Sequence, residues 1–197
     1  MRVFKKVKRE GQKYEKCLAD KRCVASSWAS GAAGLTLPGG GTAPARVFDS
    51  EAEALDALKR NMIKPNNVIV VRYEGPRGAP GLRELLLLTY YLRAAGLNES
   101  CAIVADGKFS GFAKGPFICQ VTPEAAIGGP IAVAKDDDLI EIDIPNKRLN
   151  INISKEEMAK RLAEWKPKAP KVTGGILTLY ARMANSCVAG AGLPLKI

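Results

Sequence analysis

The chain has 197 residues, of which 47% are hydrophobic and 25% charged, and its net charge is +10. This size and composition suit one domain with its own packed core. The chain contains no histidine, which excludes Ser-His-Asp catalysis and histidine-bound zinc within it. Its five cysteines are an odd number. Because they form no CxxC pair, we expect free thiols in a reducing compartment, either the cytoplasm or an organelle (a plastid or mitochondrion in a eukaryote). No apolar run is long enough to cross a membrane, so we expect no membrane partner.

Positive charge is concentrated at the start of the chain. Residues 1–22 contain nine Lys or Arg and three Asp or Glu. Such an arm can bind nucleic acid or an anionic membrane surface. Few aromatic side chains stand between the charges, so we favour a solvated leader and expect no nucleic-acid partner. Residues 28–44 are rich in Gly, Ala and Pro and predict a linker. We therefore divide the chain into a basic, Gly/Pro-rich arm and linker (1–43) and one domain (44–197).

The first half of this domain alternates short apolar runs with helical patterns. The apolar runs have the length and the Val and Ile content of buried strands. The predicted strands cover residues 45–48, 68–71, 101–104 and 117–121. The predicted helices cover residues 50–60 and 82–95. Asp49 or Ser50 is expected to cap the first of these helices, and Glu51 and Glu53 in its first turn suit the helix dipole.

The second half is expected to contain a hairpin and two further helices. Residues 139–144 and 148–153 alternate apolar and polar side chains with period two, and Pro145–Lys147 forms the turn between them. Ser154–Glu157 is a capping box that begins a helix. The remaining predicted elements are a strand at 131–134, a helix ending near residue 165 and a last helix at 175–185. Many short strands among few helices indicate an α+β fold, a mixed, barrel-like sheet with flanking helices.

Two polar side chains stand where predicted strands end. Glu74 follows the strand at 68–71, and Ser110 follows the strand at 101–104. Ligands of α/β proteins collect at the carboxyl ends of strands. Composition alone supports two interpretations of Glu74 equally well: a ligand for a hard metal ion, or an exposed charge. Ser110 could be a nucleophile or base, but composition favours an ordinary turn residue.

Two other segments suggest chemistry only weakly. Asp136–Asp138 could hold a metal ion, but adjacent side chains point in different directions and the spacing is not that of an EF-hand, so we favour a solvated turn. The glycine-rich segment Gly75–Gly81 has the composition of a phosphate-binding loop. It lacks the lysine and the spacing of the known nucleotide motifs, which disfavours a nucleotide site.

Six short segments, taken together, favour a functional interpretation of Glu74 and Ser110. They are APARVFDSE (43–51), VVRYEGP (70–76), DGKFSG (106–111), TPEAAIGGPIA (122–132), IDIPN (142–146) and WKP (165–167). In this order they resemble the C-terminal domain of the dihydroxy-acid dehydratase / 6-phosphogluconate dehydratase family. The resemblance runs from about Pro44 to Gly190, and the pattern is more similar to the dihydroxy-acid branch than to the sugar-acid branch.

The resemblance implies a function and a swivelling, β-barrel-like domain with flanking helices. Enzymes of this family are lyases that remove water from a 2,3-dihydroxy acid to give a 2-oxo acid, a step of branched-chain amino-acid biosynthesis. They use an iron–sulfur cluster and Mg²⁺, and they are homodimers. The resemblance assigns Glu74 to the magnesium ion and makes Ser110 the catalytic base.

The same resemblance implies that the chain is incomplete as an enzyme. The cluster cysteines of the family lie in an N-terminal domain, and none of the five cysteines here matches them. We therefore expect a fragment or C-terminal portion that is inactive unless an N-terminal dehydratase domain or a full-length homologue supplies the rest.

Some residues depart from the family pattern. Leu87–Tyr90 replaces a polar Pro-Thr-Ser segment, and Gln120 stands where a histidine is usual. These changes put the handling of the substrate in doubt. The alternative function is a non-catalytic binding or regulatory module derived from this domain.

Overall fold

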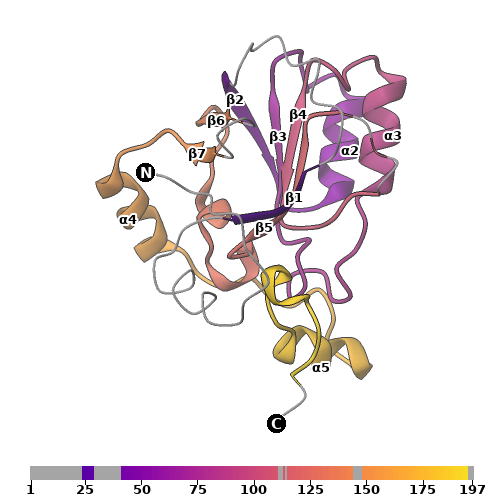
Figure 1. Ribbon diagram of the computed structural model, residues 1–197, viewed down its shortest axis with the longest axis vertical. Coiled ribbons are helices and arrows are strands. Elements are labelled where there is room, and N and C mark those ends of the chain that lie inside the picture. Colours follow the sequence, from indigo (N-terminus) through magenta and orange to yellow (C-terminus); the bar gives the residue numbers. More distant parts are fainter. Residues whose placement is uncertain (1–23, 29–40, 111–112, 114, 144–147, 195–197) are drawn as a thin grey trace.

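Figure 1 shows a computed structural model of the chain, which describes residues 24–28, 41–110, 113, 115–143 and 148–194. Residues 1–22, most of the predicted linker and the hairpin turn at 145–147 lie outside the described residues. The described strand β2 begins at Gly41, and a further strand, β1, precedes it. The division of the chain between residues 43 and 44 stays a prediction.

The described residues form seven strands and four α-helices. The strands are β1 (Val24–Trp28), β2 (Gly41–Phe48), β3 (Val68–Val71), β4 (Ala102–Ala105), β5 (Phe117–Thr122), β6 (Leu139–Asp143) and β7 (Arg148–Ile151). The α-helices are α2 (Glu51–Lys59), α3 (Leu86–Ala94), α4 (Lys155–Glu164) and α5 (Gly175–Met183). Three short 3₁₀ helices are η1 (Ala125–Ile127), η2 (Pro130–Val133) and η3 (Cys187–Ala189).

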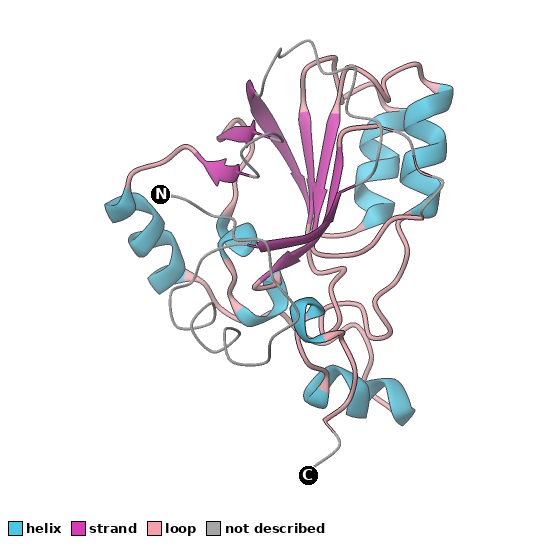
Figure 2. Ribbon diagram, in the orientation of Figure 1, coloured by secondary structure: helices cyan, strands magenta, loops and turns pink. Residues whose placement is uncertain are grey.

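All seven strands belong to one mixed sheet, in the order β1-β5-β4-β3-β2-β6-β7. Strands β2 to β5 are parallel, while β1, β6 and β7 pair antiparallel with their neighbours. The first half of β2 pairs with β6 and its second half with β3, so this strand joins the two parts of the sheet. The sheet curls into a half-barrel with helices at its flanks (Figure 2), which confirms the predicted α+β class.

Both faces of the parallel strands are buried. Ile69 and Val71 of β3 belong to an apolar cluster with Leu58 of α2 and Leu88 of α3. On the opposite face, Val68 and Val70 belong to a second cluster, against which side chains of α4 pack. Figure 1 shows α2 and α3 on one side of the sheet and α4 on the other. Burial on two faces explains why these strands are continuous apolar runs instead of alternating ones.

The structure confirms the predicted hairpin and two predicted helix caps. Strands β6 and β7 pair antiparallel, with Ile142 opposite Leu149. The Ser154 hydroxyl accepts from the N–H of Glu157 at the start of α4 (3.1 Å). The Ser50 hydroxyl does the same for α2. These features depend on local sequence, which is why the pattern of residues predicts them.

Two predicted elements differ from the structure. The strand expected at 131–134 is wrong, because these residues form the 3₁₀ helix η2, in which the N–H of Ala132 donates to Gly129 O (2.9 Å). The helix expected from Leu82 begins four residues later, at Leu86. Leu82 has a φ of 53°, which an α-helix cannot contain, and Glu84 forms an isolated bridge with Lys108.

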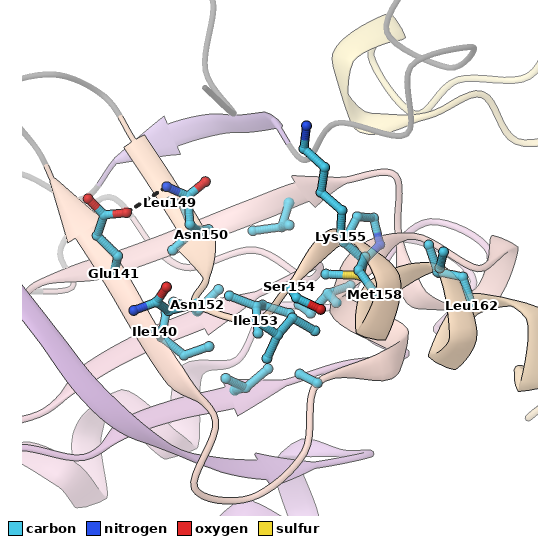
Figure 3. A pocket seen from close by; sticks show the side chains of 18 of the residues that line it. Ile140, Glu141, Leu149, Asn150, Asn152, Ile153, Ser154, Lys155, Met158 and Leu162 are labelled. Carbon is cyan, nitrogen blue, oxygen red and sulfur yellow. Dashed lines mark hydrogen bonds between the residues drawn. The ribbon is translucent and has the colours of Figure 1, made fainter. Parts of the chain in front are cut away.

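A cavity of about 640 Å³ lies between the inner face of the sheet and α4 (Figure 3). Most of its lining is aliphatic, with Ile140, Leu149, Met158 and Leu162 among the side chains that surround it. Glu141 and Asn150 bond to each other at its rim. The described residues that line the cavity include neither Glu74 nor Ser110. Within the described residues there is no helix of the length and apolarity needed to span a membrane.

Candidate functional site

One buried acidic residue follows each of the four parallel strands. Glu51 comes after β2, Glu74 after β3, Asp106 after β4 and Glu124 after β5. They are 2%, 2%, 0% and 4% exposed, respectively. Because the strands run in the same direction, these residues gather at one edge of the sheet, which we call the carboxyl edge. Charged side chains are almost never this deeply buried unless they have partners.

The carboxylate of Glu74 is compensated from two directions. Its Oε1 accepts from the main-chain N–H of Glu51 and from Lys171 Nζ, both at 3.1 Å. The Lys171 ammonium also donates to Tyr73 O (2.8 Å). The Glu74 N–H donates to Asp106 Oδ1 (2.8 Å). Glu74 is therefore bound both at its side chain and at its main chain.

Asp106 connects the ends of three strands. Besides Glu74, it accepts from the N–H groups of Tyr73 (3.1 Å) and Ala125 (2.9 Å) through Oδ2. Burial raises the pKa of Asp106 to about 6, although the three main-chain donors act against this rise. The Asp106 carboxylate thus connects, through hydrogen bonds, the segment after β3 and the segment after β5 to the end of β4.

Glu124 organises the loop that follows Glu74. Its carboxylate accepts from the N–H groups of Arg77 and Gly78, both at 3.0 Å. Burial raises the pKa of Glu124 to about 7. A Cβ on Gly75 would lie 2.5 Å from Glu124 Oε2, so the loop closes around this carboxylate only with a glycine there.

Ser110 is half-buried and follows Asp106 by four residues. The turn that leads to it packs directly on Glu74, since a Cβ on Gly107 would lie 2.9 Å from Glu74 Cβ. The N–H of Gln120, one of the departures from the family pattern, donates to Gly107 O (2.7 Å). The structure therefore places Gly107, three residues before Ser110 in the chain, directly against Glu74. The roles of Glu74 and Ser110 as metal ligand and base stay predictions.

The segment after α4 crosses the carboxyl edge. Trp165 Nε1 donates to the Tyr73 hydroxyl (3.2 Å), and Lys168 forms an ion pair with Asp49. Lys171 follows and reaches Glu74. We call residues 165–171 the crossing segment. Its Lys171 places a cation beside Glu74, a residue almost 100 positions earlier in the chain. The sequence pattern does not predict this contact.

Three of the four buried acids, Glu51, Asp106 and Glu124, are not predicted as site residues by the sequence pattern. Asp106 and Glu124 lie in the segments DGKFSG and TPEAAIGGPIA, and the sequence pattern explains Glu51 only as a partner of the dipole of its own helix. In the structure the Glu51 carboxylate pairs with Arg83 (2.8 Å). The available signal was positional, because each acid comes within three residues of the end of a parallel strand.

The residues that the structure describes do not by themselves fit the metal ion or the cluster that the resemblance implies. Within the described residues, no group of three or more His, Cys, Asp and Glu side chains is placed to hold a metal ion. Glu74 offers a single carboxylate. The described cysteines are free thiols. Burial raises the pKa of Cys101, and raises that of Cys187 to about 12, so both are poor sources of the thiolate that a cluster needs.

The chain is similar to known proteins over most of its length. The family described as dihydroxy-acid/6-phosphogluconate dehydratase C-terminal matches residues 16–191. A dihydroxy-acid dehydratase of Agathobacter rectalis is 49% identical over 152 residues, which are 77% of this chain and 27% of that protein. The dihydroxy-acid dehydratase of Acetivibrio thermocellus is 48% identical over 153 residues, 78% of this chain and 28% of that protein. That of Sulfurisphaera tokodaii is 48% identical over 150 residues, 76% of this chain and 27% of that protein.

The chain thus spans a little over a quarter of the length of these curated relatives. The matched region contains every strand of the sheet and all four acids of the carboxyl edge. The chain belongs to the dihydroxy-acid/6-phosphogluconate dehydratase family, of which it contains the C-terminal domain.

Proposed function

We propose that this chain is the C-terminal portion of a dihydroxy-acid dehydratase-like lyase. The observation that carries the proposal is the 48–49% identity to dihydroxy-acid dehydratases over about three quarters of the chain. The substrate would be a small 2,3-dihydroxy acid, and the setting branched-chain amino-acid biosynthesis. Net loss of the C2 proton and of the C3 hydroxide, which together make one molecule of water, gives an enol that tautomerises to the 2-oxo acid.

In this proposal Ser110 takes the C2 proton and Glu74 is the ligand that this domain gives to Mg²⁺. The packing of the Gly107 turn on Glu74 supports a shared site for the two residues. The remaining metal ligands, and all ligands of the iron–sulfur cluster, would come from outside this chain. A serine hydroxyl is almost fully protonated in water, and only its alkoxide could take the C2 proton, so Ser110 would need a neighbouring cation to lower its pKa. The chain alone is therefore expected to be inactive.

The partner that completes the site would be an N-terminal dehydratase domain or a full-length homologue. The test is to mix the chain under anaerobic conditions with the N-terminal part of the Acetivibrio thermocellus enzyme and to measure 2-oxo acid formed from 2,3-dihydroxyisovalerate. We expect no turnover by either part alone and turnover by the mixture. Ser110→Ala should lower the rate of the mixture by roughly a hundredfold or more, the range of general-base catalysis.

A matched control is Ser154→Ala, which removes the hydroxyl that caps α4, away from the carboxyl edge. This variant should keep the rate of the mixture. Turnover by the chain alone, or an active Ser110→Ala mixture, would contradict the proposal.

The second candidate is a non-catalytic binding or regulatory module. The ion pair between Lys171 and Glu74 favours it, because it compensates the buried carboxylate without a metal ion. This candidate predicts that the chain binds a full-length dehydratase and alters its rate, and that the Ser110→Ala variant does so as well as the wild type. The same comparison of Ser110→Ala with the wild type therefore separates the two candidates.

A further inference from the structure

The main chain that leads to Glu74 has an unfavourable conformation. Tyr73 has a φ of 61°, in the left-handed region that residues with a Cβ rarely adopt. This turn directs the chain out of β3 and places the Glu74 side chain at the carboxyl edge. A conformation of this kind persists only when the surrounding structure holds it.

Asp106 supplies that support. The N–H groups of Tyr73 and Glu74, on either side of the unfavourable turn, both donate to its carboxylate (3.1 and 2.8 Å). The third donor, Ala125 N–H (2.9 Å), comes from the chain after β5. Asp106 is 0% exposed, so water does not compete for these bonds. An ionised carboxylate carries only acceptors and can serve three donors at once, whereas the amide of an asparagine would turn a donor toward at least one of them.

Asp106 also lies in the turn that carries Ser110. The residue after it, Gly107, packs against Glu74 so closely that a side chain could not fit between them. One carboxylate therefore fixes the main chain at Glu74 relative to the segment that leads to Ser110. Glu74 and Ser110 follow different strands, β3 and β4; Asp106 is the first residue after β4 and accepts hydrogen bonds from the segment after β3.

We infer that Asp106 is the positioning residue of the carboxyl edge: its bonds to the Tyr73 and Glu74 amides set the place of Glu74 relative to the Ser110 turn. This inference deepens the proposed function and rests on it for the catalytic meaning of Glu74. The hydrogen bonds themselves do not depend on that function.

The test is amide hydrogen exchange, followed by NMR at one pH, in the full chain and its Asp106→Asn variant. We expect the protection of the Tyr73 and Glu74 amides to fall roughly tenfold to a hundredfold, the range for a lost bond to a charged group. The amide of Val70, inside the ladder of β3, should keep its protection. Unchanged protection at Tyr73 and Glu74 would overturn the inference, and so would an equal loss at Val70, which would mean a general loss of structure.

A matched control is Asp138→Asn, in the turn that precedes β6. The Asp138 side chain is 9% exposed, pairs with Arg161 and accepts from the N–H of Lys135 (2.8 Å). This variant should change exchange at Lys135 and leave Tyr73 and Glu74 protected.

A second measurement needs no variant and so does not depend on whether Asp106→Asn folds. In the wild-type chain, a scalar coupling across the hydrogen bond should join the Glu74 amide nitrogen to the Asp106 carboxyl carbon. Absence of this coupling would overturn the inference.

The outcomes also separate the inference from the proposed function. In an active mixture with the N-terminal part, Asp106→Asn should lower kcat with little change in KM. If the wild-type mixture is inactive while the exchange result holds, the proposed function fails and the positioning role of Asp106 stands.

Discussion

The carboxyl edge and the region of β6, β7 and α4 both contain several acidic residues, but they satisfy them in different ways. At the carboxyl edge, Asp106 and Glu124 are buried and bind main-chain N–H groups. In the other region, Glu141 and Glu157 lie near the surface and pair with arginine side chains. Surface ion pairs of this kind can be lost at little cost.

The difference indicates what each region is built for. Burying a carboxylate costs free energy that main-chain donors only partly return. Local arrangements that reduce stability are typical of functional sites, whereas a structural region follows the ordinary rules of capping and pairing. Four predictions test this contrast, ordered from the largest expected effect to the smallest.

The largest effect is expected at Gly129, where the chain returns from Glu124. A Cβ there would lie 1.8 Å from Pro123 O, a backbone atom that cannot move aside easily. Gly129→Ala should lower the free energy of unfolding by about 3 kcal/mol or more, measured by urea denaturation. The control is Gly192→Ala, where a Cβ meets no atom within 4 Å. Equal stability of the two variants would show that the packing around Glu124 is looser than described.

The second effect is a dependence of stability on pH. The folded-state pKa of Glu124 is raised to about 7 from an ordinary value of 4.5, so the folded chain holds this proton more tightly than the unfolded chain. The stabilisation of the folded state by protonated Glu124 is fully present below about pH 4.5. It is lost as the pH rises through 7, which lowers the free energy of unfolding by about 3 kcal/mol. Asp106, whose pKa is raised to about 6, acts in the same direction.

Urea denaturation at pH 5 and pH 8 measures this dependence. The free energy of unfolding should fall between the two values, and it should fall less in Glu124→Gln, which cannot ionise. A wild-type chain that is more stable at pH 8 than at pH 5 would contradict the prediction.

The third effect concerns the crossing segment. Lys171→Met removes the cation that compensates Glu74 and leaves Glu51 N–H as the partner of Oε1. Because the Lys171 side chain is 39% exposed, water compensates part of the loss, and we expect a destabilisation of about 1 to 2 kcal/mol. Lys168→Met is the matched control from the same segment. Its side chain is 51% exposed, and it should cost less than about 1 kcal/mol.

The smallest effect is expected for the surface pair of the hairpin. Arg148→Gln removes the partner of Glu141 and should change the free energy of unfolding by less than about 1 kcal/mol. This small effect should shrink further at high salt, because exposed charges are screened. A loss as large as that of Lys171→Met would remove the contrast between the two regions.

Local features of the fold could be predicted from the sequence. The runs that became β3 and β4, the caps at Ser50 and Ser154 and the β6–β7 hairpin all depend on neighbours within a few positions. Glu74 and Ser110 can be identified as candidates from the sequence because they follow the ends of predicted strands. The clearest errors lie at η2, where Arg72 donates to Ala132 O, and at the start of α3, where Glu84 forms a bridge with Lys108; both contacts join residues distant in sequence.

The rest of the site could not be predicted because its contacts are not periodic in sequence. Lys171 meets Glu74 across 97 positions, and Asp106 meets Tyr73 across 33. Neither contact can be recognised from the hydropathy pattern or from the spacing of residues in the sequence. The burial of Glu124 could not be predicted from the sequence either, since a charged residue in a turn is usually solvated.

A hydrogen bond between the first turns of α2 and α3 bears on the order in which these two helices form. The N–H of Leu88, in the first turn of α3, donates to the carboxylate of Glu51, in the first turn of α2 (3.0 Å). A short helix of this kind is marginal on its own, because nucleation is costly and its first N–H groups lack acceptors. We therefore expect α3 to become stable only once α2 has docked beside it. The N–H of the same Glu51 donates to the Glu74 carboxylate (3.1 Å), so Glu51 contacts both the first turn of α3 and the carboxyl edge.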